Sequence, residues 1–314
     1  MKRVRRSVAF RRILGIISLA LVLLSPTGAR QQREPDPQAV RAQVRAYRQR
    51  HDAAIVRTLA EFLSLPNVAS DRGNIERNAR WILREFERRG IRGELLRVGD
   101  SPPVVYGELV VPGARRTVIF YVHYDGQPVD PSQWATDPWT PVLRDKPLEQ
   151  GGQIIEWSAL RSPVPGEWRL YARSASDDKA PLIALLTALD ALRAADIPLS
   201  VNIKFFLEGE EEAGSPHLAD LIRASAERLK ADVWLLCDGP VHQTRRMQVY
   251  FGARGIVDLE LTVYGPIRPL HSGHYGNWAP NPAMLLSHLL ASMRTSDGRI
   301  SIPGFYDDVR PLTE

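Results

Sequence analysis

The 314-residue sequence has a single cysteine, no apolar run long enough to cross a bilayer, and no internal repeat or low-complexity tract. Because Cys237 has no second cysteine to pair with, an intrachain disulfide is excluded. The longest largely apolar run, residues 13–24, is too short for a membrane-spanning helix, which needs about 20 residues. With 44% apolar and 25% charged residues, the composition is that of an ordinary globular protein with one large or two moderate domains.

The positive charge of the sequence is concentrated at its beginning. Six of the 41 Lys and Arg residues lie in residues 1–29, which hold no acidic residue, and the other 35 are balanced by 36 Asp and Glu. No nucleic-acid partner is therefore expected. The cationic start, the apolar run and the small residues at 27–29 are typical of a signal peptide. We predict a signal peptide over residues 1–29 and an exported protein, periplasmic or secreted. An uncleaved leader that anchors the protein to the membrane is the alternative.

Helical and strand patterns alternate through the body of the chain. Asp36 followed by Pro37 predicts the start of a long helix, and a second helix with one apolar face ends at Gly90. Further helices are expected over about 180–195 and 216–229, and strands over 93–98, 104–111, 117–122, 201–207 and 233–237. This order predicts an α/β fold with a mostly parallel sheet flanked by helices. Such sheets bind ligands beyond the carboxyl ends of their strands.

The pattern changes after residue 248. Apolar and polar residues alternate over 257–263, which predicts a strand with one solvated face, and a helix is expected from about 281 to 293. We therefore expect a first domain over residues 30–248 and the beginning of a smaller α+β domain over 249–314.

Two polar motifs flank these elements in the first half of the chain. His123 and Asp125 follow the buried strand 117–122, where the imidazole could bind a metal ion and the carboxylate could orient it. Asp177 and Asp178 precede a helix, and a carboxylate there could bridge two metal ions. Taken singly, the first motif also fits a surface loop and the second a helix N-cap.

Two acidic motifs follow the later strands. Residues 208–212 hold four glutamates after a strand, and Asp238 follows another. A solvated charge run is the alternative for the glutamates, but such crowding favours a general base together with a metal ligand. Asp238 by itself is a common strand-end residue. The convergence of all four motifs on the carboxyl ends of successive strands is what predicts a metal site.

From about residue 50 onward these motifs resemble the M20 family of zinc metallopeptidases (M20/M25/M40), which includes carnosinase-like dipeptidases. The resemblance implies that two Zn²⁺, or Co²⁺ or Mn²⁺ in their place, are held by His123, Asp177, Glu212 and Asp238, with Asp177 bridging. It also implies that Asp125 orients His123. Glu211 would be the general base that takes a proton from a metal-activated water.

The same resemblance assigns residues 30–248 to the metallopeptidase catalytic domain and residues 249–314 to part of a lid, or dimerisation, domain. His271, in Leu-His-Ser-Gly, would reach the partner's active site in a homodimer, although alone it also fits a loop histidine. The family has a last histidine ligand after the lid, and no remaining histidine stands in that context. We therefore expect the second metal site to be incomplete within these 314 residues, and this polypeptide alone to be inactive.

The function expected from this resemblance is the hydrolysis of dipeptides or short peptides. Two features favour peptide hydrolysis. The residue at position 238 is Asp, whereas the deacylase branches of the family resemble one another in having Glu there. The doublet of Asp177 and Asp178 points the same way. The alternatives are an N-acyl-amino-acid amidohydrolase that uses the same metals, and a non-catalytic module that binds metal or peptide. The presence of Glu211 argues against a non-catalytic module, because a pure binding site needs no base.

Overall fold

The computed structural model describes residues 36–311, so the signal peptide predicted for residues 1–29 lies outside the described residues. The described residues form two compact units, which meet between Pro240 and Val241 in the sequence. The division falls shortly before the domain boundary expected at 248. Of the helices in the described range, none is long and apolar enough to cross a membrane.

The first unit is built on a five-stranded sheet with the order β1-β2-β7-β3-β8. Strands β7 and β3 are parallel, as are β3 and β8, whereas β2 joins β7 and β1 joins β2 in the antiparallel sense. The predicted α/β class is confirmed, and the antiparallel attachment of the first two strands is an addition to it. The bounds are β1 (Arg92–Leu96), β2 (Val104–Leu109), β3 (Thr117–His123), β7 (Asn202–Glu208) and β8 (Val233–Leu236).

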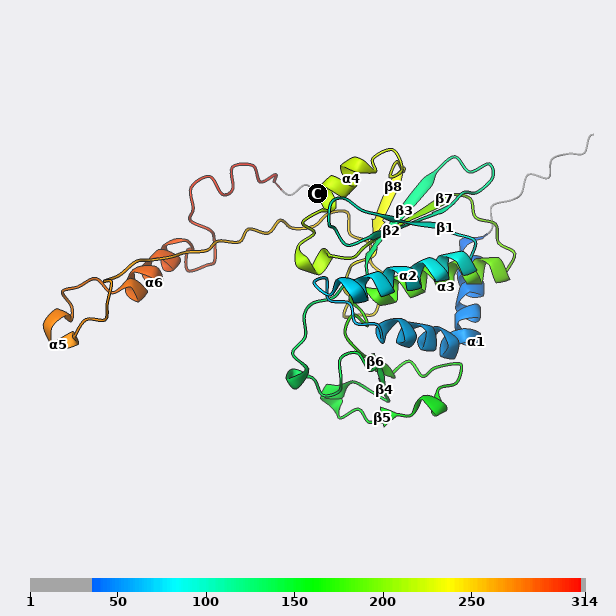
Figure 1. The fold of residues 1–314 in the computed structure, drawn as a ribbon, viewed down its shortest axis with the longest axis horizontal. Coiled ribbons are helices and arrows are strands. Elements are labelled where there is room, and N and C mark those ends of the chain that lie inside the picture. Colours follow the sequence, from blue (N-terminus) through cyan, green and yellow to red (C-terminus); the bar gives the residue numbers. More distant parts are fainter. Residues whose placement is uncertain (1–35, 312–314) are drawn as a thin grey trace, which may run out of the picture. The chain divides into compact units, whose positions relative to one another are not determined.

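Helices cover both faces of this sheet (Figure 1). Helices α1 (Pro37–Leu63), α2 (Arg72–Arg88) and α3 (Lys179–Ala194) lie on one face, and α4 (Leu218–Ala224) lies on the other, ending earlier than expected. Along β7, Phe205 and Leu207 belong to the core cluster of the three-helix face, whereas Phe206 packs with Leu221 of α4. Burial on both faces explains why Phe205, Phe206 and Leu207 are consecutive apolar residues in this strand.

The predicted start of the first helix and the predicted end of the second are confirmed. Asp36 caps α1 by accepting the Gln38 N–H, and Pro37 occupies the first turn. Helix α2 buries the predicted face, including Ile75 and Phe86, and Gly90 follows its end with a φ of +65°. That left-handed conformation strains most residues but not glycine.

The stretch between β3 and α3 forms a small three-stranded sheet that the sequence did not predict. Its order is β5-β4-β6, with β4 (Val142–Arg144), β5 (Ile154–Ile155) and β6 (Arg169–Tyr171). Three 3₁₀-helices lie in the same stretch, η1 (Pro131–Gln133), η2 (Leu148–Gln150) and η3 (Trp157–Ala159). Elements of two or three residues are too short to show a period in the sequence.

The second unit contains the helices α5 (Ser272–Tyr275) and α6 (Pro282–Ser292), and α6 confirms the helix expected from about 281. The strand expected over 257–263 is wrong for the described residues of this unit. Val257 and Leu259 are exposed, and residues 241–311 show only one isolated bridge, between Arg294 and Ile300. A strand requires a pairing partner, and alternation along one segment cannot supply it.

Candidate metal centre

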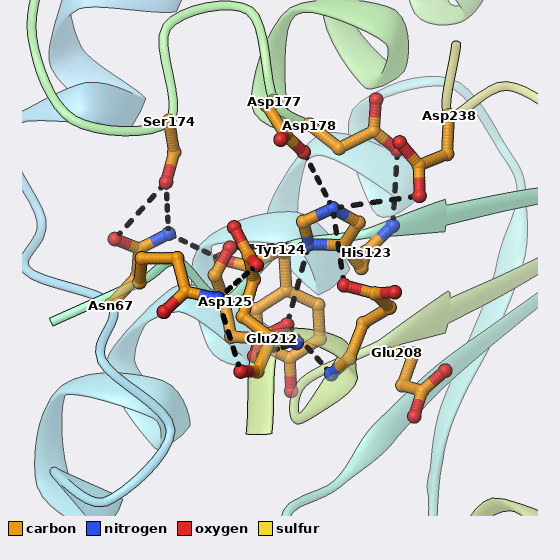
Figure 2. Close-up of polar contacts among 12 residues, drawn as sticks. Asn67, His123, Tyr124, Asp125, Ser174, Asp177, Asp178, Glu208, Glu212 and Asp238 are labelled. Carbon is orange, nitrogen blue, oxygen red and sulfur yellow. Dashed lines mark hydrogen bonds and ion pairs between the residues drawn. The ribbon is translucent and has the colours of Figure 1, made fainter. Parts of the chain in front are cut away.

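The four predicted motifs meet at one edge of the sheet. His123 ends β3 and is paired in register with Glu208, which ends the parallel strand β7. Asp238 lies just beyond β8, and the loop that leads into α3 brings Asp177 to the same place (Figure 2). The carboxyl ends of neighbouring parallel strands therefore gather one imidazole and several carboxylates, as expected from the sequence.

One ring nitrogen of His123 faces three carboxylates. Its Nε2 lies 2.8 Å from Asp177 Oδ1, 3.8 Å from Asp238 Oδ2 and 3.9 Å from Glu211 Oε2. The residue is only 1% exposed, so the ring is fixed by its surroundings. An imidazole nitrogen surrounded by carboxylate oxygens is a donor set that suits a divalent cation such as Zn²⁺.

The other ring nitrogen of His123 is held by Asp125. His123 Nδ1 lies 3.2 Å from the Asp125 carbonyl oxygen and 3.4 Å from its Oδ1. The buried Asp125 carboxylate also accepts the backbone N–H of Glu211 at 3.1 Å and that of Glu212 at 3.0 Å. One side chain therefore orients both the imidazole and the acidic turn η4 (Glu211–Ala213). The sequence predicted the first of these roles and missed the second.

The side chains form two groups whose potential ligand atoms lie within 4.8 Å of one another. One group is His123, Asp177 and Glu212, and the other is His123, Asp178 and Asp238. Asp177 thus lies within reach of His123 and Glu212, whereas the group that contains Asp238 holds Asp178 instead. The bridging role of Asp177 stays a prediction. Asp178 is a site residue that sequence reasoning did not assign, although the acidic doublet was visible.

The two aspartates of the doublet have different surroundings. The side chain of Asp177 is 66% exposed, whereas Asp178 is 1% exposed and accepts the backbone N–H of His123 at 3.2 Å. Burial raises the pKa of Asp178 to about 8, with His123 opposing the rise and Asp238 adding to it.

The carboxylates around His123 change its pKa, and His123 in turn affects theirs. Burial acts to lower the pKa of His123, but Asp125, Asp178 and Asp238 outweigh it and raise that pKa to about 10. The pKa of Glu211 is raised by burial and by neighbouring carboxylates, although His123 opposes the rise. Burial likewise raises the pKa of Asp238. Carboxylates this close together repel one another, and a nearby positive charge offsets that repulsion. The residues present therefore fit a bound divalent cation.

The four glutamates of residues 208–212 divide into two pairs. Glu211 and Glu212 face the site, whereas Glu208 accepts the Tyr121 hydroxyl at 2.7 Å and Glu210 bonds to His217 Nδ1 at 3.0 Å. Only two of the four therefore face the site, and the other two bond to Tyr121 and His217, with Glu208 Oε1 left buried and without a hydrogen-bond partner. A solvated charge run does not describe them, since Glu208 and Glu210 are buried.

Two amides near the site escaped the sequence analysis. Gln127 Nε2 donates to Glu212 Oε2 at 2.6 Å, and the buried Asn67 Nδ2 donates to the Tyr124 carbonyl at 2.7 Å. Isolated amides in loops have no period or spacing that would reveal them. His271 belongs to the second unit, where it caps α5 and its Nδ1 accepts the Gly273 N–H at 3.0 Å. Its part in the site stays a prediction.

Several known proteins are similar to this chain. Residues 119–274 match the family model described as Peptidase family M20/M25/M40. The Cys-Gly metallodipeptidase dug1 of Schizosaccharomyces pombe is 32% identical over 273 residues, which cover 82% of this chain and 53% of that protein. The Beta-Ala-His dipeptidase of Homo sapiens is 31% identical over 321 aligned residues, covering 96% of this chain and 59% of that protein.

A solved structure gives the same result. The M20 family metallo-carboxypeptidase Sso-CP2 from Sulfolobus solfataricus superimposes with a TM-score of 0.60 and 30% identity, over 83% of this chain and 54% of that one. The chain spans about half the length of the curated relatives it matches. The match includes His123, Asp177, the acidic turn and Asp238, and on these grounds the chain belongs to peptidase family M20/M25/M40.

Proposed function

We propose that this chain provides the metal centre of a peptidase that hydrolyses dipeptides or other short peptides. The observation that carries the proposal is the position of His123 Nε2 among the carboxylates of Asp177, Asp238 and Glu211, which come from three separate segments. The dipeptidase names of two relatives support the same substrate class.

Two divalent ions, zinc in first place, would be held by four side chains. His123, Asp177 and Asp238 would supply the first set of ligands, because both carboxylates lie near His123 Nε2, and Asp177 and Glu212 would belong to the second. Bound metal at such a site acidifies water and polarises a carbonyl oxygen. The ions could also be Co²⁺ or Mn²⁺, since carboxylate-rich sites accept several divalent metals.

Glu211 is the proposed general base. Its side chain is 36% exposed to solvent, and its Oε2 lies 3.9 Å from Nε2 of His123. Burial and the neighbouring carboxylates raise the pKa of Glu211, which makes its carboxylate a stronger base. Glu211 takes a proton from the attacking water and passes it to the leaving amine.

Hydrolysis assays distinguish this function from its two alternatives. A zinc-loaded form that spans the length of the relatives should cleave unblocked dipeptides with a higher kcat/KM than N-acyl amino acids. The reverse order would identify an N-acyl-amino-acid amidohydrolase. A form that binds zinc but cleaves neither panel would be a non-catalytic binding module.

Two further parts of the proposal concern the protein as a whole. We propose a homodimer formed through the lid domain, residues 249–314, in which His271 contributes to the partner's active site. We also propose export, periplasmic or secreted, directed by residues 1–29. Both rest on the sequence patterns described above.

A further inference from the structure

The loop that follows α1 contributes no metal ligand, yet it contacts two of the segments that do. Its central residue is Asn67, which is 0% exposed. Figure 2 shows its side chain between the segment of His123 and Asp125 on one side and Ser174 on the other. A buried amide needs hydrogen-bond partners, and Asn67 finds them on two segments that are far apart in the sequence.

The first contact of Asn67 is with the loop after β3. Its Nδ2 donates to the carbonyl of Tyr124, the residue between His123 and Asp125, at 2.7 Å. The backbone carbonyl of Asn67 accepts the Gly126 N–H at 2.9 Å, and Val68 forms an isolated parallel bridge with Gly126. The backbone on both sides of Asp125 is therefore tied to residues 67–68.

The second contact is with the loop before α3. Asn67 Nδ2 also donates to Ser174 Oγ at 3.0 Å, and Ser174 precedes Asp177 in that loop. A Cβ atom placed on Gly126 would overlap Ser174 Oγ, so the two ligand loops touch at this point without spare room. Asn67, Gly126 and Ser174 thus interlock at the point where the two loops meet.

The other end of the acidic doublet is tied to the same region. Lys179, which follows Asp178, is fully buried, and its Nζ donates to the carbonyls of Phe62 at 2.8 Å and Leu65 at 2.9 Å. The doublet therefore lies between Ser174, which bonds to the loop after α1, and Lys179, which bonds to the end of α1 and to the same loop.

We infer that Asn67 is a positioning residue that sets the separation between the His123 loop and the Asp177 loop, and through it the affinity for metal. The inference rests on the proposed metal centre. Metal sites require ligand positions correct to a few tenths of an ångström, so a small shift between two ligand loops weakens binding. Ser174 and Gly126 complete the same interlock.

The decisive variant is Ser174→Gly. Ser174 has a φ of +60°, which glycine adopts without strain, so this change removes the hydroxyl with little cost to folding. We expect Zn²⁺ to bind the 314-residue variant about tenfold more weakly than wild type in competition with a chromophoric chelator, as is usual for partners behind metal ligands. The thermal unfolding midpoint without metal should stay near that of wild type.

A matched control and a second variant test the specificity of this effect. Ser101 is equally buried, and its hydroxyl accepts the Val98 N–H at 3.1 Å, so Ser101→Ala should leave the zinc affinity unchanged. Asn67→Ala should also weaken zinc binding, and the double variant with Ser174→Gly should bind no more weakly than Asn67→Ala alone, because the shared contact is already lost.

Wild-type zinc affinity in Ser174→Gly, or an equal loss in Ser101→Ala, would overturn the role of Asn67 and Ser174 while leaving the metal centre intact. Fully additive losses in the double variant would also contradict it. Failure of wild type itself to bind zinc would instead reject the proposed metal centre, and the inference with it.

Discussion

The Asp125 carboxylate accepts the backbone N–H of Glu211 at 3.1 Å, which links the end of β3 directly to the proposed general base. The same carboxylate lies 3.4 Å from Nδ1 of His123. A single buried side chain therefore fixes both a proposed ligand and the proposed base, which are 88 positions apart in the printed sequence.

Asp125→Asn should weaken zinc binding by about 10- to 100-fold, because an amide group cannot accept both backbone N–H groups and orient the imidazole as well. Zinc competition titrations measure the loss. Asp130→Asn is the matched control, since Asp130 also accepts a backbone N–H, from Ser132, but is exposed. Equal zinc affinities in wild type and Asp125→Asn would show that Asp125 does not position the site.

Glu211→Gln should keep the metal content and lose turnover by about 10²- to 10⁴-fold, because a neutral amide cannot take the proton from water. Dipeptide hydrolysis together with metal analysis, on a form that spans the length of the relatives, checks this. Glu210→Gln is the control, because Glu210 bonds to His217 and not to the site. A near-normal kcat in Glu211→Gln with unchanged metal content would remove Glu211 from the mechanism.

His217 should make the stability of the first unit depend on pH. Its hydrogen bond with Glu210 raises the pKa of His217, and burial opposes this rise. The negative charges of Glu210 and Asp100 raise the pKa further, whereas the positive charge of Arg72 lowers it. Since the pKa is raised on folding, the stabilisation is fully present below the unfolded value of about 6.5 and is lost as the pH rises through the folded value. The unfolding midpoint of wild type should exceed that of His217→Gln most at low pH.

Thermal unfolding of both proteins between about pH 5 and about pH 9 measures that difference. A difference that stays constant or grows as the pH rises would show that the His217 and Glu210 pair does not stabilise the charged imidazole.

His271→Ala should lower kcat/KM without reducing metal content, if His271 acts on the partner's site in a homodimer. Mixing the His271→Ala and Glu211→Gln proteins should then restore part of the activity, because one of the two sites in a mixed dimer has both residues intact. Absence of recovery in verified mixed dimers would give His271 a role within its own subunit.

The sequence predicted the site best where residues follow regular elements. His123 could be placed because the apolar run of β3 ends directly before it, and the acidic turn could be placed because the apolar residues Phe205, Phe206 and Leu207 of β7 precede it. Asp178 was visible only as half of a doublet, and its burial depends on packing that no local pattern encodes. The contacts of Asn67 and Gln127 depend on loops brought together by the fold.

The same distinction applies to the fold. The helical spacing of apolar residues correctly predicted the buried face of α2, because a helix makes its own backbone hydrogen bonds. Alternation of apolar and polar residues failed to predict the structure of residues 257–263, because a strand depends on a partner elsewhere in the chain. The antiparallel attachment of β2 to β7 likewise depends on long-range pairing that the separate strand patterns do not specify.

Anomalous diffraction from crystals of the zinc-loaded chain, recorded at the zinc absorption edge, tests the central claim most directly. We predict a peak about 2.0–2.2 Å from His123 Nε2 and from carboxylate oxygens of Asp177 and Asp238, the distances usual for zinc. In zinc-loaded crystals of the His123→Ala variant, this peak should be weakened or absent. A zinc peak away from His123, or an unchanged peak in the variant, would contradict the assignment of this edge of the sheet as the metal centre.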